Sequence, residues 1–342
     1  MRVLVAMSGG VDSSVAAALL LEAGHDVTGC TMKLWGGASD SGCCSVADVD
    51  DARRVAQQLG IDHFVFNFGD DFTAAVVEPY VAAHAGGRTP NPCVECNRSL
   101  KFDRLARRAH ALGFDALATG HHARSERIGA SWRLRRGVDR AKDQSYVLHM
   151  LDQAALARTL LPVGALTKAE VRERAASLGL RTAAKPDSQD VCFITSGGGR
   201  RWFLEARLAL TPGRVVDGEG REVGRVGAVE LVTAGQRRGL GLAGGGEARY
   251  AVAVDVAGAT VTVGGPQDLL TGEVALEAVS WVDGPVEGRV EVQCSAHGTP
   301  RPATFDLDGA VVRFDRPAPR VAPGQSVVLY RADEVQGGGT AR

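Results

Sequence analysis

A glycine- and serine-rich segment near the N-terminus has the residue types of a phosphate-binding loop. Ser8–Ser14, with the sequence SGGVDSS, follows the apolar run Val3–Ala6 and precedes a helical pattern. Gly9 and Gly10 let the backbone approach an anion without a Cβ in the way, and the free N–H groups of the next helix point at the same place. The segment lacks the Lys-Ser/Thr pair of a Walker A loop and the third glycine of a dinucleotide-binding loop. The pattern favours an ATP site over the simpler alternative, a Gly/Ser turn that caps an ordinary helix.

Two residues around this loop have both a functional and an ordinary interpretation. Asp12 offers the oxygen ligands that Mg²⁺ shares with substrate phosphates, and it is equally typical of an acid in the first turn of a helix. Met32 ends the second expected strand, where its backbone would meet adenine. The spacing alone favours a core methionine at that position.

Cysteines form a second group of reactive candidates. Cys93 and Cys96 lie in the segment RTPNPCVECNR, in which two prolines stiffen the chain. A helix expected over Ser99–Leu112 would begin close to Cys96, beside Arg98, and the pKa of a thiol falls in such a place. Cys192 is distant in sequence, in the segment DSQDVCF. We therefore expect these thiols to be reactive and to act as nucleophiles.

A metal site is the alternative use of the same thiols. Cys93 and Cys96 together with Cys43 and Cys44 would supply four thiolates for zinc. Adjacent cysteines are poorly spaced for zinc, however, and one CxxC motif alone is a weak signal. The sequence favours reactive cysteines over a structural metal.

Alternating strand and helix patterns must position these groups. Strands are expected at Val3–Ala6, Val27–Met32, His63–Phe68 and Ala116–Thr119, and helices at Val11–Ala23, Val46–Leu59, Phe72–Ala83, Ser99–Leu112 and Lys168–Leu178. Such alternation predicts an α/β fold with a doubly wound parallel sheet, in which ligands bind beyond the carboxyl ends of the strands. We expect this α/β domain, which carries the glycine loop, to span residues 1–200.

The pattern changes after about residue 200. A helix around Trp202–Leu208 precedes short apolar runs at Tyr250–Val256, Thr260–Val263, Val274–Val282, Val290–Cys294 and Val311–Phe314, separated by Asp-Gly turn signals. We expect a small mixed or β central domain over residues 201–268 and a C-terminal β-barrel-like domain over residues 269–336. The glycine-rich residues 337–342 are expected to form a flexible tail.

The composition is that of a globular protein: 342 residues, 45% hydrophobic and 23% charged. No apolar run approaches the ~20 residues of a membrane span, so we expect a cytoplasmic protein without a membrane partner. The net charge of −1 excludes a uniformly basic nucleic-acid binder but allows a locally basic groove. Seven cysteines do not indicate a disulfide framework, and Cys30 and Cys294 are expected to be inert core residues.

These motifs together resemble those of a known family. SGGVDSS is similar to the PP-loop of ATP pyrophosphatases, which split ATP into AMP and pyrophosphate while adenylating a substrate. With the Cys96 and Cys192 segments, the chain resembles the bacterial tRNA-specific 2-thiouridylases, the MnmA family, which convert wobble uridine 34 to 2-thiouridine. The resemblance runs nearly the whole length, through TGHHAR at 119–124, KDQSY at 142–146, GQRRGLG at 235–241 and PGQ at 323–325.

The resemblance implies a role for each matching residue. ATP would be held by Ala6, Met7, Ser8, Gly9, Gly10, Val11, Asp12, Ser13, Met32 and Gly120. Cys96 would be the nucleophile and Cys192 the carrier of persulfide sulfur, with Asn91, Pro92 and Cys93 against the target base. The tRNA would be contacted by His121, Lys142, Asp143, Gln144 and Gln325.

The resemblance also implies cofactors and partners. ATP and Mg²⁺ would be used by a monomer that acts on lysine, glutamate and glutamine tRNAs. Sulfur would come from a cysteine desulfurase or a sulfur-relay protein. Adenylation would turn the uridine C2 oxygen, a poor leaving group, into AMP, and the paired thiols would then deliver sulfur.

The chain departs from the family pattern at two positions, Cys93 and Ser295. Some members have Asp at the position of Cys93, which puts a chemical role for this residue in doubt. The Cys93 thiol also allows an iron–sulfur cluster held by Cys93, Cys96 and Cys192. Ser295 stands where the family usually has an arginine that contacts tRNA. RNA binding would otherwise depend on basic stretches at Arg98–Arg108, Arg133–Arg136, Arg200-Arg201 and Arg237-Arg238.

Two other functions fit parts of the sequence. An amidotransferase-linked synthetase or a lysidine synthetase would also adenylate its substrate, but it would not need Cys96 or Cys192. A tRNA-binding protein with a structural zinc or iron–sulfur site would not need an ATP-splitting loop.

Overall fold

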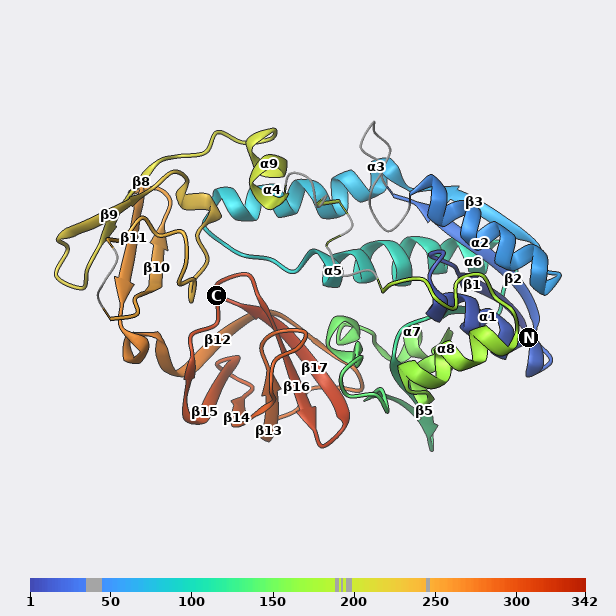
Figure 1. Ribbon diagram of the computed structural model, residues 1–342. Coiled ribbons are helices and arrows are strands. Elements are labelled where there is room, and N and C mark those ends of the chain that lie inside the picture. Colours follow the sequence, from blue (N-terminus) through green and yellow to red (C-terminus); the bar gives the residue numbers. More distant parts are fainter. Residues whose placement is uncertain (35–44, 188–190, 192, 195–198, 244–246) are drawn as a thin grey trace.

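The computed structural model describes residues 1–34, 45–187, 191, 193–194, 199–243 and 247–342. Cys43, Cys44 and Cys192 lie outside these described residues. Three sheets divide the described chain, one parallel, one mixed and one antiparallel (Figure 1). No helix in the described ranges is long and apolar enough to cross a membrane.

The first sheet is parallel, as the alternation predicts. Its strands lie in the order β3 (His63–Asn67), β2 (Asp26–Lys33), β1 (Arg2–Ala6), β4 (Ala116–Thr119) and β7 (Thr159–Leu160). Side chains alternate across the sheet, so Val3 and Val5 of β1 face one layer of helices and Leu4 faces the other. The sheet is therefore buried on both faces, which is typical of doubly wound folds.

Helices cover the two faces of this sheet. One face carries α1 (Val11–Glu22), α2 (Val46–Leu59) and α8 (Lys168–Ser177), and the apolar residues of all three share one core cluster. The other face carries two longer helical runs. The first consists of α3 (Gly69–Phe72), the π-helical segment η1 (Thr73–Val77) and α4 (Glu78–Ala85), and the second of α5 (Pro92–Glu95), the π-helical segment η2 (Cys96–Leu105) and α6 (Ala106–Ala111).

The helix expected over Ser99–Leu112 begins earlier, at Pro92. Asn91 caps it, since the Asn91 side chain accepts a hydrogen bond of 3.1 Å from the Cys93 N–H. A proline at the first helical position loses no hydrogen bond, because that N–H has no partner within a helix. The placement of Cys96 at the helix N-terminus is thus wrong: it lies in the second turn.

Short helical segments connect the first sheet to the rest of the chain. They are η3 (Ser145–Leu148), α7 (Gln153–Leu156), η4 (Pro162–Ala165) and α9 (Gly199–Glu205). The central sheet then follows in the order β10 (Tyr250–Asp255), β11 (Thr260–Gly264), β8 (Gly213–Val216) and β9 (Glu222–Val226), with β11 and β8 parallel and the other pairs antiparallel. Its valines, together with those of η5 (Val229–Leu231), form a separate core.

The C-terminal strands close into an antiparallel barrel. After η6 (Pro266–Leu269), the ring order is β12 (Leu270–Trp281), β15 (Val311–Pro319), β14 (Arg301–Asp306), β13 (Gly288–Gln293), β16 (Ser326–Arg331) and β17 (Glu334–Ala341), and β17 pairs back onto β12. Closure removes the free strand edges, which would otherwise be open to pairing with other chains.

The expectation of a flexible tail at residues 337–342 is wrong. Residues 337–341 belong to β17 and pair with both β16 and β12. Their glycines allow close packing here: a Cβ on Gly337 would lie 2.2 Å from the Ser280 carbonyl oxygen, and one on Gly338 would lie 2.8 Å from the ring of His149. The same glycine run that suggests disorder in the sequence is thus required for backbone contact.

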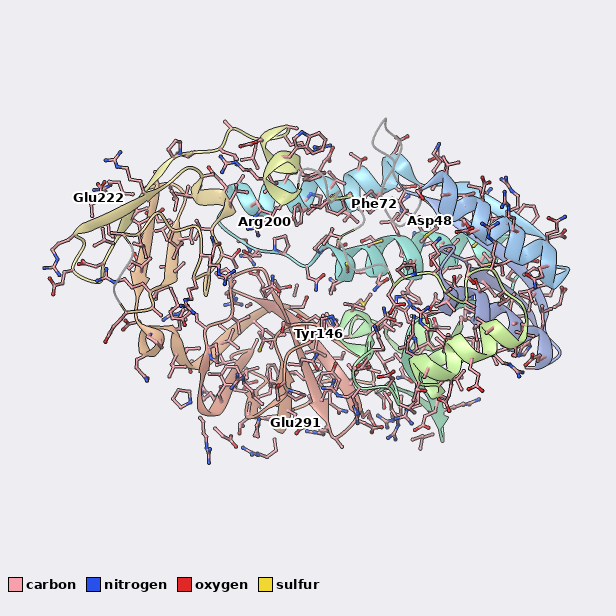
Figure 2. All side chains as sticks on the ribbon, viewed as in Figure 1. Asp48, Phe72, Tyr146, Arg200, Glu222 and Glu291 are labelled. Atoms are coloured by element: carbon pink, nitrogen blue, oxygen red, sulfur yellow. The ribbon has the colours of Figure 1, made fainter. Side chains whose placement is uncertain are left out.

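A hairpin from the first half of the chain extends the barrel sheet. The strands β5 (Ala123–Ile128) and β6 (Ser131–Arg136) pair with each other, and Leu134 and Arg135 of β6 pair with β17. Leu134 and Tyr146 are buried in a core cluster that also includes residues of β16 and β17. Tyr146, labelled in Figure 2 between the helices and the barrel, donates a 2.7 Å hydrogen bond to the Ser326 carbonyl.

The basic stretch Arg133–Arg136 is used for this junction. Arg133 pairs with Asp283 at 2.9 Å, and Arg135 pairs with Asp333 at 2.8 Å. Arg136 pairs with Asp143 at 3.0 Å. These charges fasten the hairpin to its surroundings within the protein.

Candidate active site

The glycine loop lies at the carboxyl end of β1 and leads directly into α1. Its backbone is held by its own serines: Ser13 Oγ accepts a 3.2 Å bond from the Ser8 N–H and donates one of 3.2 Å to the Gly10 carbonyl. Ser14 Oγ donates a 2.8 Å bond to the same carbonyl. The N-terminal N–H groups of the 12-residue helix α1 are therefore directed at the loop, which is the arrangement that binds phosphate.

Close packing against neighbouring backbone fixes the shape of this loop. Gly9 has φ of +71°, and a Cβ there would lie 2.2 Å from the Asp48 carbonyl oxygen at the start of α2. A Cβ on Gly120, just after β4, would lie 2.6 Å from the Ser13 nitrogen. Gly120 thus abuts the loop, as its expected place at the ATP site requires. Met32 is buried at the end of β2, and its side chain packs in the core cluster that includes Leu34.

Asp12 is engaged by two basic side chains. Both of its carboxylate oxygens accept 2.7 Å hydrogen bonds from Lys168 Nζ, and Oδ1 lies 3.0 Å from His122 Nε2. Burial acts to raise the pKa of Asp12, but these partners outweigh burial and the pKa is lowered. The carboxylate is therefore ionised and paired, so an Mg²⁺ ion would compete with Lys168 for it.

The same lysine links the loop to the segment that leads toward Cys192. Lys168 Nζ lies 2.9 Å from Asp187, which also pairs with Lys142 at 2.8 Å and with Arg172 at 2.8 Å. Burial opposes ionisation of Asp187, but hydrogen bonds from Lys142 and Lys168 lower its pKa to about 2. Lys142, expected to contact tRNA, is thus connected to Asp12 through three successive ion pairs, Lys142–Asp187, Asp187–Lys168 and Lys168–Asp12.

Sequence reasoning missed Lys168, His122 and Asp187 as members of this site. A signal for Lys168 was present, because Thr167 and Glu170 predict a capping box, and the structure confirms it. The box places Lys168 at the first position of α8. Nothing in the sequence indicated that α8 starts beside the glycine loop.

The residues expected to contact tRNA are held mostly by the protein itself. Asp143 is buried, and its oxygens accept from Arg136, the Gly137 N–H and Ser145. His121 is buried against Phe102, and burial holds the pKa of its imidazole well below the usual range. The Asp143 carboxylate therefore shapes the loop around it by hydrogen bonds within the protein.

Gln144 and Gln325 hold neighbouring backbone in the same way. Gln144 Oε1 accepts a 2.9 Å bond from the His122 N–H, and Gln325 Nε2 donates a 2.5 Å bond to the Thr89 carbonyl. The turn that carries Gln325 is thereby docked beside the segment that enters the Cys93 helix. The structure brings Gln325 against Thr89, two residues before Asn91, although 236 positions separate Thr89 from Gln325.

The described cysteines have different surroundings. Cys96 is 8% exposed and packs in the core cluster that contains Met32 and Phe193, the residue after Cys192. Cys93, one helical turn earlier, is exposed. Burial raises the pKa of Cys30 to about 12 and that of Cys294 to about 11, which agrees with an inert role for both. Within the described residues, no three metal-binding side chains gather into a metal site.

Comparisons with known proteins cover almost all of this chain. Family models match residues 1–196 (tRNA methyl transferase HUP domain), 201–265 (tRNA methyl transferase PRC-barrel domain) and 271–341 (Aminomethyltransferase beta-barrel domain). The tRNA-specific 2-thiouridylase MnmA of Chloroflexus aurantiacus is 50% identical over 99% of this chain and 97% of its own. The chain belongs to the MnmA family.

Other members of the MnmA family are nearly as similar. The protein of the same name from Roseiflexus sp. is 47% identical over 99% of this chain and 98% of its own, and that from Mycolicibacterium paratuberculosis is 46% identical over the same shares. The fold agrees with this membership: a parallel five-stranded sheet with helices, a mixed central sheet and a six-stranded antiparallel barrel. The MnmA family is an ATP-using PP-loop family.

Proposed function

We propose that this protein is a tRNA 2-thiouridylase that adenylates the C2 oxygen of uridine 34 and replaces it with sulfur. The products would be 2-thiouridine, AMP and pyrophosphate. The observation that carries the proposal is full-length similarity to 2-thiouridylases together with a glycine loop shaped for phosphate. The substrates would be lysine, glutamate and glutamine tRNAs in the cytoplasm.

Each half of the reaction would use its own residues. Backbone N–H groups at the start of α1 would hold the ATP phosphates while the uridine C2 oxygen attacks the α-phosphate and pyrophosphate leaves. The outer sulfur of a Cys192 persulfide would then attack C2 and expel AMP. Cys96 thiolate would attack the Cys192 sulfur of the resulting disulfide, which releases 2-thiouridine and leaves a Cys96–Cys192 disulfide. A thiol reductant would restore both thiols.

The surroundings of Cys96 support its part in this scheme. Val191 and Phe193, on either side of Cys192, pack in the same core cluster as Cys96. Asn91, Pro92 and Cys93 form the start of the Cys96 helix, where Cys93 is exposed and Pro92 is buried, and a target base would approach from the side of Cys93. A cysteine desulfurase or a relay protein would supply the sulfur. The protein would act as a monomer. Its domain boundaries would lie near residues 200 and 268.

Two metal-dependent features belong to this proposal. Magnesium would enter with the ATP phosphates, because Lys168 already occupies both oxygens of Asp12. Cys93 and Cys96, one turn apart on a helix, also fit two positions of an iron–sulfur cluster completed by Cys192. Iron and sulfide analysis of protein purified without oxygen would detect such a cluster.

A reconstituted thiolation reaction tests the proposal. Unmodified glutamate tRNA, ATP, magnesium and a persulfide-generating desulfurase should give 2-thiouridine, detected by nucleoside mass spectrometry. We expect Cys96→Ser and Cys192→Ser to remove the product and to leave tRNA affinity nearly unchanged. Cys30→Ser, at a buried cysteine outside the proposed chemistry, is the control. If Cys96→Ser and Cys192→Ser still thiolate tRNA, this chemistry is excluded and another adenylating enzyme is favoured. If both variants lose tRNA binding, the two cysteines belong to a structural site.

A further inference from the structure

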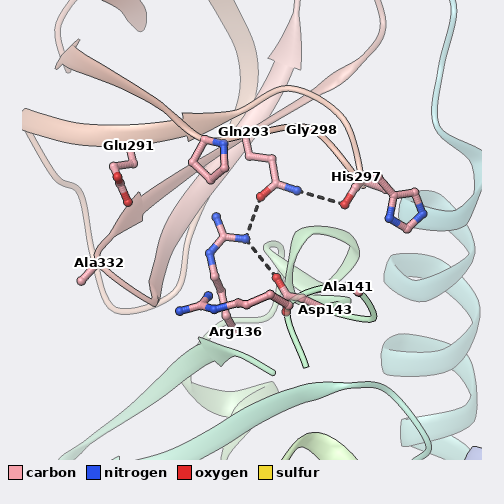
Figure 3. Close-up of a pocket in the computed structure, with 11 residues that line it drawn as sticks. Arg136, Ala141, Asp143, Glu291, Gln293, His297, Gly298 and Ala332 are labelled. Atoms are coloured by element: carbon pink, nitrogen blue, oxygen red, sulfur yellow. Dashed lines mark hydrogen bonds and ion pairs between the residues drawn. The ribbon is translucent and has the colours of Figure 1, made fainter. Parts of the chain in front are cut away.

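The C-terminal barrel contacts the first half of the chain at separate junctions. One junction lies beside β6, where Arg136 donates hydrogen bonds to Asp143 at 3.0 Å and to Gln293 at 2.7 Å (Figure 3). Another lies at residues 88–89, in the segment that connects α4 to α5 (Figure 1). This segment leads directly into the residues expected at the target base, so its position matters for the reaction proposed above.

Bonds from the barrel hold Arg88 and Thr89. The Thr89 N–H donates a 2.7 Å hydrogen bond to the Pro323 carbonyl, and Gln325 Nε2 donates one of 2.5 Å to the Thr89 carbonyl. The Arg88 guanidinium forms an ion pair with Glu277 of β12. The barrel therefore fixes the chain immediately before α5 begins.

A strained β-bulge lies beside Glu277. The pairing of β12 with β17 shifts between Glu277 and Ser280, where β12 has one extra residue. Ala278 in this bulge has a φ of +49°, in the left-handed region that residues other than glycine seldom adopt. Backbone strain of this kind gathers at functional sites, where the surrounding structure holds the chain in an unusual direction.

The bulge changes which way the side chains of β12 point. Leu276 before the bulge and Val279 after it both pack in the barrel core. In an unbroken strand these two residues would lie on opposite faces, because side chains alternate. The bulge thus leaves Glu277 and Ala278 together on the outer side of the barrel. Bulges also bend a strand and re-aim the side chains beside them, and here the bend comes where Glu277 reaches the 88–89 segment.

We propose that Glu277, directed by the bulge at Ala278, is a positioning residue for thiolation. It acts through Arg88 and keeps the segment 88–91 where the Cys96 helix meets the target base. The inference rests on the proposed function, since it takes that base as the substrate. Glu277 belongs to the barrel and not to the glycine loop, so its loss slows the reaction without weakening ATP binding.

Single-turnover thiolation tests this role. Protein loaded with persulfide sulfur, in excess over unmodified glutamate tRNA, is mixed with ATP and magnesium. We expect Glu277→Gln to lower the rate constant on the order of 10-fold, because misplacement of reacting groups is costly. The Arg88 and Glu277 side chains are 36% and 39% exposed, and such a pair adds little stability, so Tm and ATP affinity should stay close to wild type. Glu273→Gln, at an exposed glutamate of the same strand, is the matched control.

A double variant tests whether Glu277 acts through Arg88. Arg88→Gln should slow the reaction about as much as Glu277→Gln, and the protein with both changes should be no slower than Arg88→Gln alone. Rate losses that multiply would show separate roles and overturn the proposal. If wild-type protein thiolates tRNA and Glu277→Gln is as fast as Glu273→Gln, the positioning role alone is refuted. Wild-type protein that does not thiolate refutes the proposed function, on which this inference rests.

Valine at Ala278 tests the bulge. A β-branched residue fits the left-handed region worse than alanine, so in Ala278→Val we expect the bulge to shift and the rate constant to fall as in Glu277→Gln. Ala310→Val is the control, since Ala310 has the same φ of +49° between β14 and β15. It should lose a similar amount of stability and keep the wild-type rate. If Ala310→Val also loses the rate, or if Ala278→Val keeps it, the role of the bulge is overturned.

Discussion

Gly120 gives the sharpest test of how the glycine loop is held. Its φ is not positive, so a change to alanine adds no backbone strain and its effect is steric. The new Cβ would lie 2.6 Å from the Ser13 nitrogen, 2.7 Å from the Asp12 carbonyl carbon and 2.9 Å from the Ser13 Cα. All three atoms are backbone, so no side chain can rotate away. The start of α1 or the end of β4 must move.

The size of the effect follows from this crowding. Overpacking of a well-packed site costs about 1–3 kcal/mol, and 1 kcal/mol lowers Tm by about 2–4 °C in a unit of 150–250 residues. We therefore expect Gly120→Ala to melt about 2–12 °C lower. Displacement of the α1 N–H groups would cost one charge-assisted hydrogen bond to phosphate, or about 10- to 100-fold in ATP affinity.

Thermal melting and isothermal titration with ATP measure both effects. Gly218→Ala is the matched control, because a Cβ at Gly218 meets no atom within 4 Å and its φ is not positive. It should leave Tm and ATP affinity unchanged. If Gly120→Ala has the same Tm and the same ATP affinity as Gly218→Ala, the claim that the loop leaves no space for a Cβ at Gly120 is refuted.

Two further predictions concern the junctions between parts of the chain. Asp333→Asn removes ion pairs to Arg124 at 2.6 Å and to Arg135 at 2.8 Å. We therefore expect the free energy of unfolding to fall by about 1 kcal/mol at low salt and by less in 1 M NaCl. An equal drop in Tm at low salt and in 1 M NaCl would contradict this prediction. Burial lowers the pKa of His84 to about 4. Between pH 6.5 and about 4 the unfolded chain therefore binds the extra proton, and stability falls as the pH falls. In His84→Gln this part of the acid-induced drop in Tm should disappear, whereas the exposed His110→Gln should keep it; identical pH profiles would show that His84 is not responsible.

The sequence predicted local structure where local rules decide it. The helix Val46–Leu59 and the capping box of α8 occur as expected. The sequence places the start of the Cys96 helix too late, because a proline is typical both of a stiff loop and of the first helical position, which Pro92 occupies. The sequence does not predict the final strand, for a different reason. Glycines that are needed for close packing against Ser280 and His149 cannot be distinguished, in the sequence alone, from glycines of a disordered tail.

The sequence predicts the motifs of the site, but it does not predict which side chains form ion pairs there. The glycine loop and Gly120 meet as the resemblance implies. The partners of Asp12 could not be found, because Lys168 lies 156 positions away and its contact depends on how α8 packs. In the sequence alone, the run Arg133–Arg136 suggests RNA binding. The acidic residues that pair with Arg133 and Arg135 come much later in the chain, so the sequence does not show that these charges are used within the protein: Asp283, Asp333 and Glu334.

The pairing of β6 with β17 has a consequence for synthesis of the protein. Arg135 and its partner Asp333 are 198 positions apart, so the hairpin leaves the ribosome long before its neighbouring strand is made. At 5–20 residues per second the delay is about 10–40 s. During that time the apolar side of Leu134 and the open backbone of β6 are available to other chains. Chaperone demand and aggregation during expression should therefore depend on how soon the last strand of the barrel arrives.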